Sequence, residues 1–435
     1  METMSISVEL KFSIKEFPLS MSEIFLVMRD ISQQIGKRLT VELIERLEQD
    51  AARELKQQGW KRNRTQQRTL RGVLGKISLK LLRMKHPTQG TRYAVAERVE
   101  IPAYAQYTMD AFEPGMGLLA HVSYKRSSSE AKRIGGSSPA KSTLHRKLEA
   151  CAEQVEVHPD NKATGYRYLV ADGTGARFQK RKGRKRKKVV SYAGEVRMVY
   201  ASKGVGEPFD VIGRWINSSW KSIAKTVYHR IDASSIRVVI SDGGAGIEEA
   251  FVQKHMEHQR CSVHAWRDLK SLLYQDGVKK AGQKDFQEFF KRISVFDYAK
   301  KEKMESLKAE DCPRVQSAIK DSEKQLRELE ELLKEKGYHK TATYIANLSQ
   351  PLLTFLREWL ATGQAEPSTS NVAENRFSLI KNRFQRIGRR WSEAGLKRWI
   401  DVSIHKMFPG YDWNKLWEKL LPIAGNLKCE IVAIH

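Results

Sequence analysis

The order of predicted elements between residues 165 and 263 constrains the fold of this chain more than any other feature. Three strand-like segments, joined by hairpin-length or loop connections, lie at Arg167–Ala171, Val189–Ala201 and Pro208–Arg214. A helix, a buried strand, a second helix and a short strand follow, at Ser219–Arg230, Ile236–Ile240, Gly246–Lys254 and Arg260–Val263. Strands joined by short loops pair antiparallel, whereas strands separated by helices pair parallel. The sequence therefore predicts an α/β fold built on one mixed sheet, in the element order of a ribonuclease-H-like core.

Two acidic residues stand at the ends of predicted strands in this region. Asp172 follows Arg167–Ala171, Asp242 follows the strand that ends at Ser241, and a glycine comes directly after each. An isolated Asp-Gly pair is typical of a hairpin turn, which is the alternative interpretation. Asp242, however, precedes a helix, so its turn is not a simple hairpin. We expect the two carboxylates to share one cleft.

A third acidic residue, Glu374, lies at the start of a predicted helix. The pattern Asn371-x-x-Glu374 is also that of a capping box, in which the glutamate bonds back to the helix start. Both roles are compatible, because a helix N-terminus can project a side chain into a neighbouring cleft. Two or three carboxylates with substrate phosphate suffice to bind Mg²⁺ (or Mn²⁺). Two such ions are what phosphodiester cleavage uses.

The chain is strongly basic, with 77 Lys and Arg against 51 Asp and Glu and a formal net charge of +26. This excess favours a nucleic-acid partner, because each neutralised phosphate releases counterions. The four cysteines form no Cys-x-x-Cys pair and the N-terminus shows no signal-peptide pattern. No apolar run approaches the roughly 20 residues of a membrane helix. We therefore expect a soluble cytoplasmic protein without a membrane partner.

Basic and polar residues in four places are candidates for DNA contact. A basic patch near residue 61 precedes two predicted strands, Leu70–Leu74 and Lys76–Leu82. A helix at Leu118–Tyr124, a break at Ser127–Ser129, a turn at Gly135–Pro139 and a helix at Ala140–Leu148 resemble a helix-turn-helix. A loop at 180–188 has eight cations in nine residues, and the last core helix is basic. The candidates are Lys61, Arg62, Arg64, Ser142, Thr143, His145, Arg146, Lys180, Arg181, Lys182, Arg184, Lys185, Arg186, Lys187, Lys188, Lys381 and Arg383.

Each of these places has a plainer interpretation. The first patch has the composition of a solvated charged face, and the paired helices are equally typical of a structural helical hairpin. The basic loop is also typical of a disordered or targeting segment. Its position eight residues after Asp172 favours contact with a DNA backbone beside the predicted cleft.

The pattern along the chain predicts six regions. Periodic charged and apolar residues after 280 predict helices around Phe286–Phe296, Ser322–Lys336 and Tyr344–Trp359. We interpret this stretch as an all-α insertion that interrupts the core. The regions are a basic α/β DNA-binding region (1–95), a helix-turn-helix-like region (96–164), the first part of the core (165–279), the insertion (280–365), the final core helix (366–405) and a tail (406–435).

Histidine and cysteine recur every third residue at His255, His258, Cys261 and His264. Such a cluster invites a zinc site, but four ligands this close together rarely surround one tetrahedral ion. We expect Cys261 and His264 to pack and hydrogen-bond near the acidic cleft instead.

The motifs together resemble those of the Mutator-type transposases of prokaryotic insertion sequences. The resemblance lies in Asp172-Gly-Thr, in Ser241-Asp-Gly-Gly with Cys261-Ser-Val-His264 downstream, and in Asn371-x-x-Glu374. It implies an Asp-Asp-Glu triad of metal-binding catalytic residues, Asp172, Asp242 and Glu374, with Cys261 and His264 as accessory residues. It also implies a helical insertion before the glutamate, and here 132 positions lead from Asp242 to Glu374. The glycines after Asp242 depart mildly from the family pattern, where a bulkier residue is common.

These features predict a transposase that binds the terminal inverted repeats of its element and target DNA, and cleaves and transfers strands with two Mg²⁺ or Mn²⁺ ions. Holding two ends together predicts a homodimer or larger assembly, associated with the prokaryotic nucleoid. Two alternatives are a non-catalytic or domesticated DNA-binding protein and another ribonuclease-H-like phosphoryl-transfer enzyme. Asp172-Gly-Thr is also compatible with a sugar-kinase or phosphatase fold. A kinase would need a second phosphate loop, which the sequence does not show, and a phosphatase would need an aspartate at the position of Val170.

Overall fold

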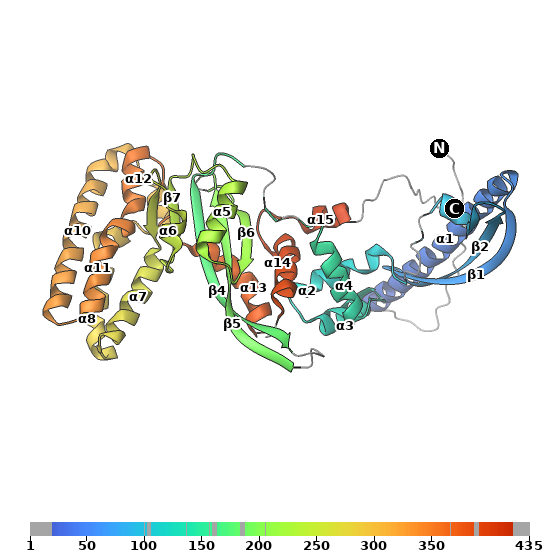
Figure 1. Cartoon of the computed structure of the whole chain (residues 1–435), viewed down its shortest axis with the longest axis horizontal. Coiled ribbons are helices and arrows are strands. Elements are labelled where there is room, and N and C mark those ends of the chain that lie inside the picture. The colour runs from blue at the N-terminus through green and yellow to red at the C-terminus, as the bar shows by residue number, and fades with distance from the viewer. Residues whose placement is uncertain are drawn as a thin grey trace. The chain divides into compact units, whose positions relative to one another are not determined.

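The computed structural model describes residues 20–99, 101, 106–135, 137–155, 157–158, 163–182, 188–204, 206–365, 367–386 and 391–420. The chain divides into two compact units (Figure 1). One consists of Met1–Cys151 with Asn414–His435, and the other of Ala152–Trp413. Each unit is described by itself below.

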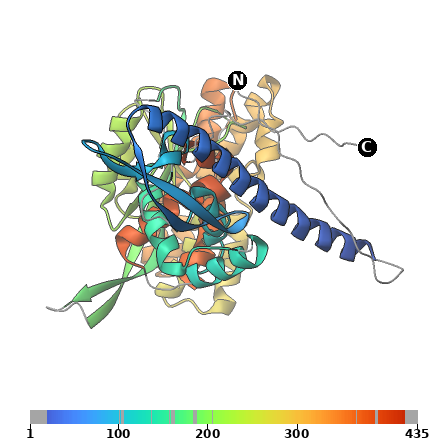
Figure 2. The same cartoon turned by 90° about the vertical axis from the view of Figure 1, so that its right-hand side faces the viewer.

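The first unit begins with a long helix lying along a three-stranded antiparallel sheet (Figure 2). The helix α1 (Met21–Gln57) starts at a capping box formed by Ser20 and Glu23. The strands are β1 (Lys61–Gly72), β2 (Gly75–His86) and β3 (Gly90–Tyr93). Gly75, at φ 99°, allows the tight β1–β2 turn. The two strands predicted on either side of Gly75 are therefore confirmed, and each is longer than expected.

Short helices complete this unit: η1 (Ala94–Glu97), η2 (Met109–Ala111), α2 (Glu113–Leu119), α3 (Tyr124–Gly135) and α4 (Lys141–Ala152). The expected helix at Leu118–Tyr124 is wrong, because that segment connects α2 to α3. The expected break at Ser127–Ser129 is also wrong, because these serines lie inside α3. The Oγ atoms of Ser127 and Ser128 donate to the backbone oxygens of Gly115 and Pro139, which satisfies side chains that otherwise disrupt helices.

The second unit contains a five-stranded mixed sheet of order β6-β5-β4-β7-β8. The strands are β4 (Tyr168–Lys182), β5 (Lys188–Ser202), β6 (Asp210–Ile216), β7 (Val238–Ser241) and β8 (Glu257–Arg260). The first three pair antiparallel, β7 pairs parallel to β4, and β8 pairs parallel to β7. Helices α5 (Trp220–Arg230) and α6 (Ile247–Phe251) pack against this sheet around Ile223 and Phe251. The predicted order of elements and the mixed sheet are confirmed.

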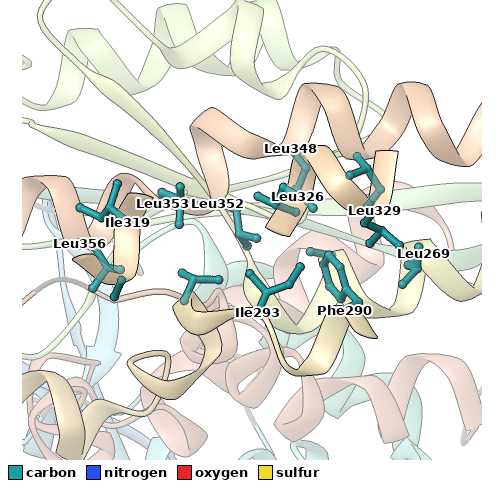
Figure 3. Close-up of a cluster of buried hydrophobic side chains, with 14 of the residues drawn as sticks. Leu269, Phe290, Ile293, Ile319, Leu326, Leu329, Leu348, Leu352, Leu353 and Leu356 are labelled. Carbon is teal, nitrogen blue, oxygen red and sulfur yellow. The ribbon is translucent and has the colours of Figure 1, made fainter. Parts of the chain in front are cut away.

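A helical region follows β8 and has its own apolar core (Figure 3). Leu269, Phe290, Leu326 and Leu348 approach one another from different helices. The elements are α7 (Ser262–Gln275), α8 (Lys280–Lys291), η3 (Ser294–Asp297), α9 (Lys301–Glu305), η4 (Ala309–Asp311), α10 (Cys312–Glu335), α11 (His339–Leu352) and α12 (Thr354–Thr362). The helical character predicted from charge periodicity after residue 280 is confirmed.

The chain then returns to the sheet. α13 (Asn371–Lys381) continues into the short π-helix η5 (Asn382–Arg386), and α14 (Glu393–Met407) follows. The last described helix, α15 (Trp413–Leu420), lies almost wholly in the segment that belongs to the first unit. α14 is tied to β6 by a buried ion pair between Arg214 and Asp401. Among the described residues, no helix has both the length and the apolar character needed to cross a membrane.

Candidate active site

Asp172 lies within β4, opposite Met198 of β5, and not at a strand end as the sequence predicted. Its side chain is buried, with 5% of the residue exposed, and its Oδ1 accepts a hydrogen bond from the backbone N–H of Gly173 at 2.7 Å. A side chain at position 173 would collide with the carboxylate of Glu195 on β5. The Asp-Gly pair therefore reflects a close approach between strands and not a turn.

Asp242 follows β7 and comes next to Asp172 through the register of the sheet. Ala171 of β4 pairs with Ser241 of β7 in parallel, so the following residue on each strand is an aspartate. Asp242 Oδ1 accepts a hydrogen bond from the backbone N–H of Gly244 at 2.8 Å, in a turn where Gly243 has φ 76°. The two glycines after Asp242 thus shape the loop that carries it.

The electrostatics of the two aspartates show how close they are. Burial, and after it the negative charge of the neighbouring Asp242 carboxylate, raise the pKa of Asp172 to about 7. The Gly173 hydrogen bond and the positive charges of His264 and Lys381 oppose this shift. A cation beside two neighbouring carboxyl groups would stabilise their ionised forms, which burial and mutual repulsion disfavour.

Glu374 lies in the first turn of α13 and faces two positively charged groups. Its Oε1 is 3.4 Å from His264 Nε2 and 3.4 Å from Arg267 Nη1, both on α7. The helix is preceded by Ser370 as its N-cap, and no side chain caps it. The capping-box interpretation of Asn371-x-x-Glu374 is therefore wrong, and the Glu374 side chain is directed towards α7.

Cys261 and His264 connect the elements that carry the acidic residues. Cys261 is fully buried, its N–H donates to Ser241 O at 2.9 Å, and its Sγ accepts from the N–H of Ser370 at 3.3 Å. Burial alone would raise the pKa of the Cys261 thiol, but hydrogen bonds with His264 and Ser370 outweigh it and hold that pKa below its usual value. The hydrogen bond with Cys261 raises the pKa of His264 against the effect of burial, and Glu374 and Asp242 add to the rise.

The other two histidines of the three-residue repeat, His255 and His258, contact other parts of the unit. His258 on β8 lies 2.9 Å from Ser241 Oγ and 3.2 Å from Glu248, and His255 lies 3.0 Å from the backbone oxygen of Ala233. The four side chains thus have separate surroundings. Within the part of the chain that the structure describes, no three His, Cys, Asp or Glu residues are gathered so as to hold a metal ion.

The donor set nevertheless suits a divalent cation at Asp172 and Asp242. Both offer hard carboxylate oxygens, and their mutual repulsion is what such a cation would relieve. Glu374 is engaged with His264 and Arg267 and would have to leave them to become a third ligand.

A cavity of about 800 Å³ lies at the start of α13, and Asp172, Asp242 and Glu374 are not among its lining residues. The cavity is bordered by Ser262 and Trp266 of α7, by Phe296 and by Asn371 at the start of α13. Lys291 Nζ lies 5.0 Å from the centre of the Trp266 ring. The helix that carries Glu374 therefore borders open space.

The residues predicted to contact DNA differ in how they are placed. Lys61, Arg62 and Arg64 are exposed on β1. Of the four residues predicted on α4, Ser142, His145 and Arg146 are exposed and Thr143 is half-buried. The His145 ring lies 5.3 Å from the Tyr124 ring at an angle of 52°, and its Nδ1 is 3.5 Å from Glu149 Oε2.

The basic loop is only partly described. Lys180 is exposed on β4, and the backbones of Arg181, Lys182 and Lys188 belong to the β4–β5 hairpin. Arg184, Lys185, Arg186 and Lys187 lie outside the described residues.

The two DNA contacts predicted at the last core helix, Lys381 and Arg383, have different surroundings. Lys381 is half-buried and close enough to lower the pKa of Asp172. Arg383 is a correction: it is 3% exposed and lies over the rings of Trp391 and Trp399, so it is not available to a phosphate.

Sequence reasoning missed Arg267 and Ser370. Arg267 follows His264 by three residues, so it lies on the same face of α7, and this spacing was the available signal. The Ser370 N–H bonds a sulfur 109 positions away, which no local pattern indicates.

Comparisons with known proteins place this arrangement in a family. A search of curated proteins found no match. The solved "Drosophila P element transposase strand transfer complex" aligns at 14% identity, covering 73% of this chain and 81% of that one. Its TM-score of 0.26 is too low to support an argument.

The family model described as "Transposase, Mutator family" matches residues 20–357, well over half of the chain. Asp172, Asp242, Cys261 and His264 lie inside the matched range, and Glu374 lies beyond it. The match confirms the family that the sequence motifs resemble. The chain belongs to the Mutator family of transposases.

Proposed function

We propose that this transposase cleaves DNA at the ends of its element and joins those ends to target DNA, with Asp172, Asp242 and Glu374 as the catalytic carboxylates. The observation that carries the proposal is the parallel register of β4 and β7, which puts Asp172 and Asp242 next to each other in one partly buried site. Glu374 comes to the same surroundings from α13, since His264 lies near both it and Asp242.

The topology supports a ribonuclease-H-like core. Three antiparallel strands followed by two parallel ones give the order β6-β5-β4-β7-β8, as the proposal requires. The helices from α8 to α12 lie between α7 and α13, so they correspond to the insertion expected before the glutamate.

The metal is Mg²⁺ or Mn²⁺, and we expect two ions. When bound, such ions polarise the scissile phosphate and make the attacking oxygen more nucleophilic. Asp172 and Asp242 provide the ligand oxygens that are already together. Glu374 would complete the ligand set if it left His264 and Arg267, and these two cationic side chains would then be free to face a phosphate.

The chemistry consists of two displacements at phosphorus. Water first attacks a phosphodiester at the element end, the P–O bond to the 3′ oxygen breaks, and that oxygen leaves as a 3′-hydroxyl after taking a proton. The 3′-hydroxyl then attacks a target phosphodiester and loses its proton. One ester bond forms as another breaks, so this joining step needs no external energy source. We expect two protomers or more, because two ends must be held together.

The test is cleavage of a duplex carrying the terminal inverted repeat, in Mg²⁺ and in EDTA. We expect Asp172→Asn, Asp242→Asn and Glu374→Gln each to abolish metal-dependent nicking. Asp285→Asn and Glu331→Gln are matched controls, because both carboxylates are exposed on the helical insertion. Nicking that survives in Glu374→Gln would remove this residue from the triad. Tight binding by the wild type without nicking, in Mg²⁺ and again with Mn²⁺ in its place, would favour the non-catalytic DNA-binding alternative.

A further inference from the structure

The β1–β2 ribbon has two faces of opposite character. Its inner face carries Leu70, Ile77, Leu79 and Leu81, which pack with apolar side chains of α1. Its outer face is formed by three cross-strand pairs. These pairs are Gln67 with Lys80, Thr69 with Ser78, and Arg71 with Lys76.

No acidic residue occurs in any of the three strands of this sheet, whereas ten lysines and arginines do. At the turn end of the ribbon, Asp110 Oδ2 accepts a hydrogen bond from the Val73 N–H at 2.6 Å, which directs this carboxylate to the backbone. The side chains of Gln67 and Ser78 are exposed and have no hydrogen-bond partner among the described residues. The outer face is therefore cationic and rich in free hydrogen-bonding groups.

We propose that this outer face binds the major groove of the element-end duplex, with Gln67, Thr69 and Ser78 towards base edges and Lys76 and Lys80 towards phosphates. The inference rests on the proposed function, because it takes the partner to be element-end DNA. A glutamine amide bonds adenine through two hydrogen bonds, and hydroxyl groups bond several base edges. Adjacent strands lie about 4.8 Å apart, so two of them fit a groove about 12 Å wide.

The other element of this unit that could contact base edges is α4, the second helix of the predicted helix-turn-helix. Next to its exposed residue His145, this helix carries the half-buried Glu149, and the two side chains are 3.5 Å apart. A carboxylate on the reading face repels phosphates, and it also engages one of the residues expected to read bases. The strands of the β1–β2 ribbon contain no carboxylate that would repel phosphates or engage the base-reading side chains. The distribution of charge therefore favours the ribbon over α4 as the element that contacts bases.

The experiment measures binding of the full chain to two labelled duplexes, at several salt concentrations. One duplex is the terminal inverted repeat that flanks the gene, and the other is a scrambled sequence of the same composition. The variants are Gln67→Ala, the double variant Lys76→Gln with Lys80→Gln, and His145→Ala. Gln89→Ala is the matched control, because this glutamine is exposed in the β2–β3 turn.

We expect Gln67→Ala to lower the preference for the repeat over the scrambled duplex by about tenfold, since one base-reading pair discriminates by that order. Its affinity for the scrambled duplex stays unchanged. The double lysine variant weakens binding to both duplexes and reduces the slope of log affinity against log salt by about 2. His145→Ala and Gln89→Ala leave the preference unchanged.

Two results overturn the inference: a preference that Gln67→Ala retains, or one that His145→Ala loses. A wild type without any preference for the repeat overturns it as well. Nicking of the repeat duplex in Mg²⁺ separates this inference from the proposed function. If the wild type nicks and Gln67→Ala keeps its preference, only the ribbon inference fails. If Gln67→Ala loses its preference but the wild type never nicks, only the proposed catalysis fails.

Discussion

Replacing Asp172 by asparagine will stabilise the unit Ala152–Trp413 in metal-free buffer, and the gain will increase with pH. Burial and Asp242 raise the pKa of Asp172 to about 7 from its ordinary 3.8, so the folded state favours the protonated acid. Below pH 3.8 the group is protonated in both folded and unfolded states and has no effect. Above that pH the unfolded chain releases the proton more readily, and the wild type loses stability until the pH exceeds 7. Asparagine has a similar shape and no charge to bury.

The size of the effect follows from the shift. A difference of about 3 pKa units corresponds to about 4 kcal/mol once both states are ionised. At pH 5 the loss is about 1.5 kcal/mol and at pH 8 about 4 kcal/mol. The stability gain of Asp172→Asn should therefore be about 2.5 kcal/mol larger at pH 8 than at pH 5.

Urea unfolding followed by tryptophan fluorescence measures this gain, because seven of the nine tryptophans lie in the unit Ala152–Trp413. The buffer contains EDTA, and Asp285→Asn serves as the exposed control. Adding Mg²⁺ should then stabilise the wild type more than the variant. A gain of the same size at pH 5 and pH 8, or a variant less stable than the wild type at pH 8, would refute the reasoning.

Three further predictions concern the surroundings of the site. Asp401→Ala leaves Arg214 buried without its partner and should cost about 3–5 kcal/mol of unfolding free energy, measured in urea. Cys261→Ala should lower the pKa of His264, measured by NMR titration of its ring, because the Cys261 hydrogen bond is the main cause of the raised value. Leu329→Ala should cost about 2–5 kcal/mol, again in urea, because this side chain is fully buried in the helical insertion.

Each of these has its own control. The double variant Arg214→Met with Asp401→Leu should recover most of the stability lost by Asp401→Ala, and a single-variant loss below 1 kcal/mol would contradict the role of the pair. Cys312→Ala should leave the His264 titration unchanged, since Cys312 lies in α10. Leu379→Ala, at a position 38% exposed, should be nearly neutral.

Sequence patterns predicted the mixed sheet because strand and helix periodicities are local properties. They failed where tertiary contacts override a local preference. The Asp172-Gly pair favours a turn, but the 15-residue pairing of β4 with β5 carries the strand straight through it. The serines at 127–129 favour a break, but hydrogen bonds to Gly115 and Pro139 keep them in α3.

The sequence predicted which residues form the candidate site and that they lie close together, but not the contacts that bring them together. The register of β4 and β7 depends on which strands become neighbours, and this follows from the whole sheet. Asn371-x-x-Glu374 matches a capping box in sequence. The Glu374 side chain is instead directed to α7, where it lies close to His264 and Arg267. Arg383 looked like a surface cation in a basic helix, and only the packing of Trp391 and Trp399 shows that it is covered.

The site is stabilised by the backbone around it and not by its own side chains. Asp172 and Asp242 repel each other, so their proximity has to be imposed by the β4–β7 register. Cys261 connects β7 to α13 through two hydrogen bonds. Its N–H donates to the backbone oxygen of Ser241 at the end of β7, and its sulfur accepts from the N–H of Ser370, the residue before α13. One small buried residue thus fixes the loop of Asp242 and the helix of Glu374 relative to each other. A Cys-x-x-His pair can therefore hold together the elements that carry carboxylates through its hydrogen bonds alone.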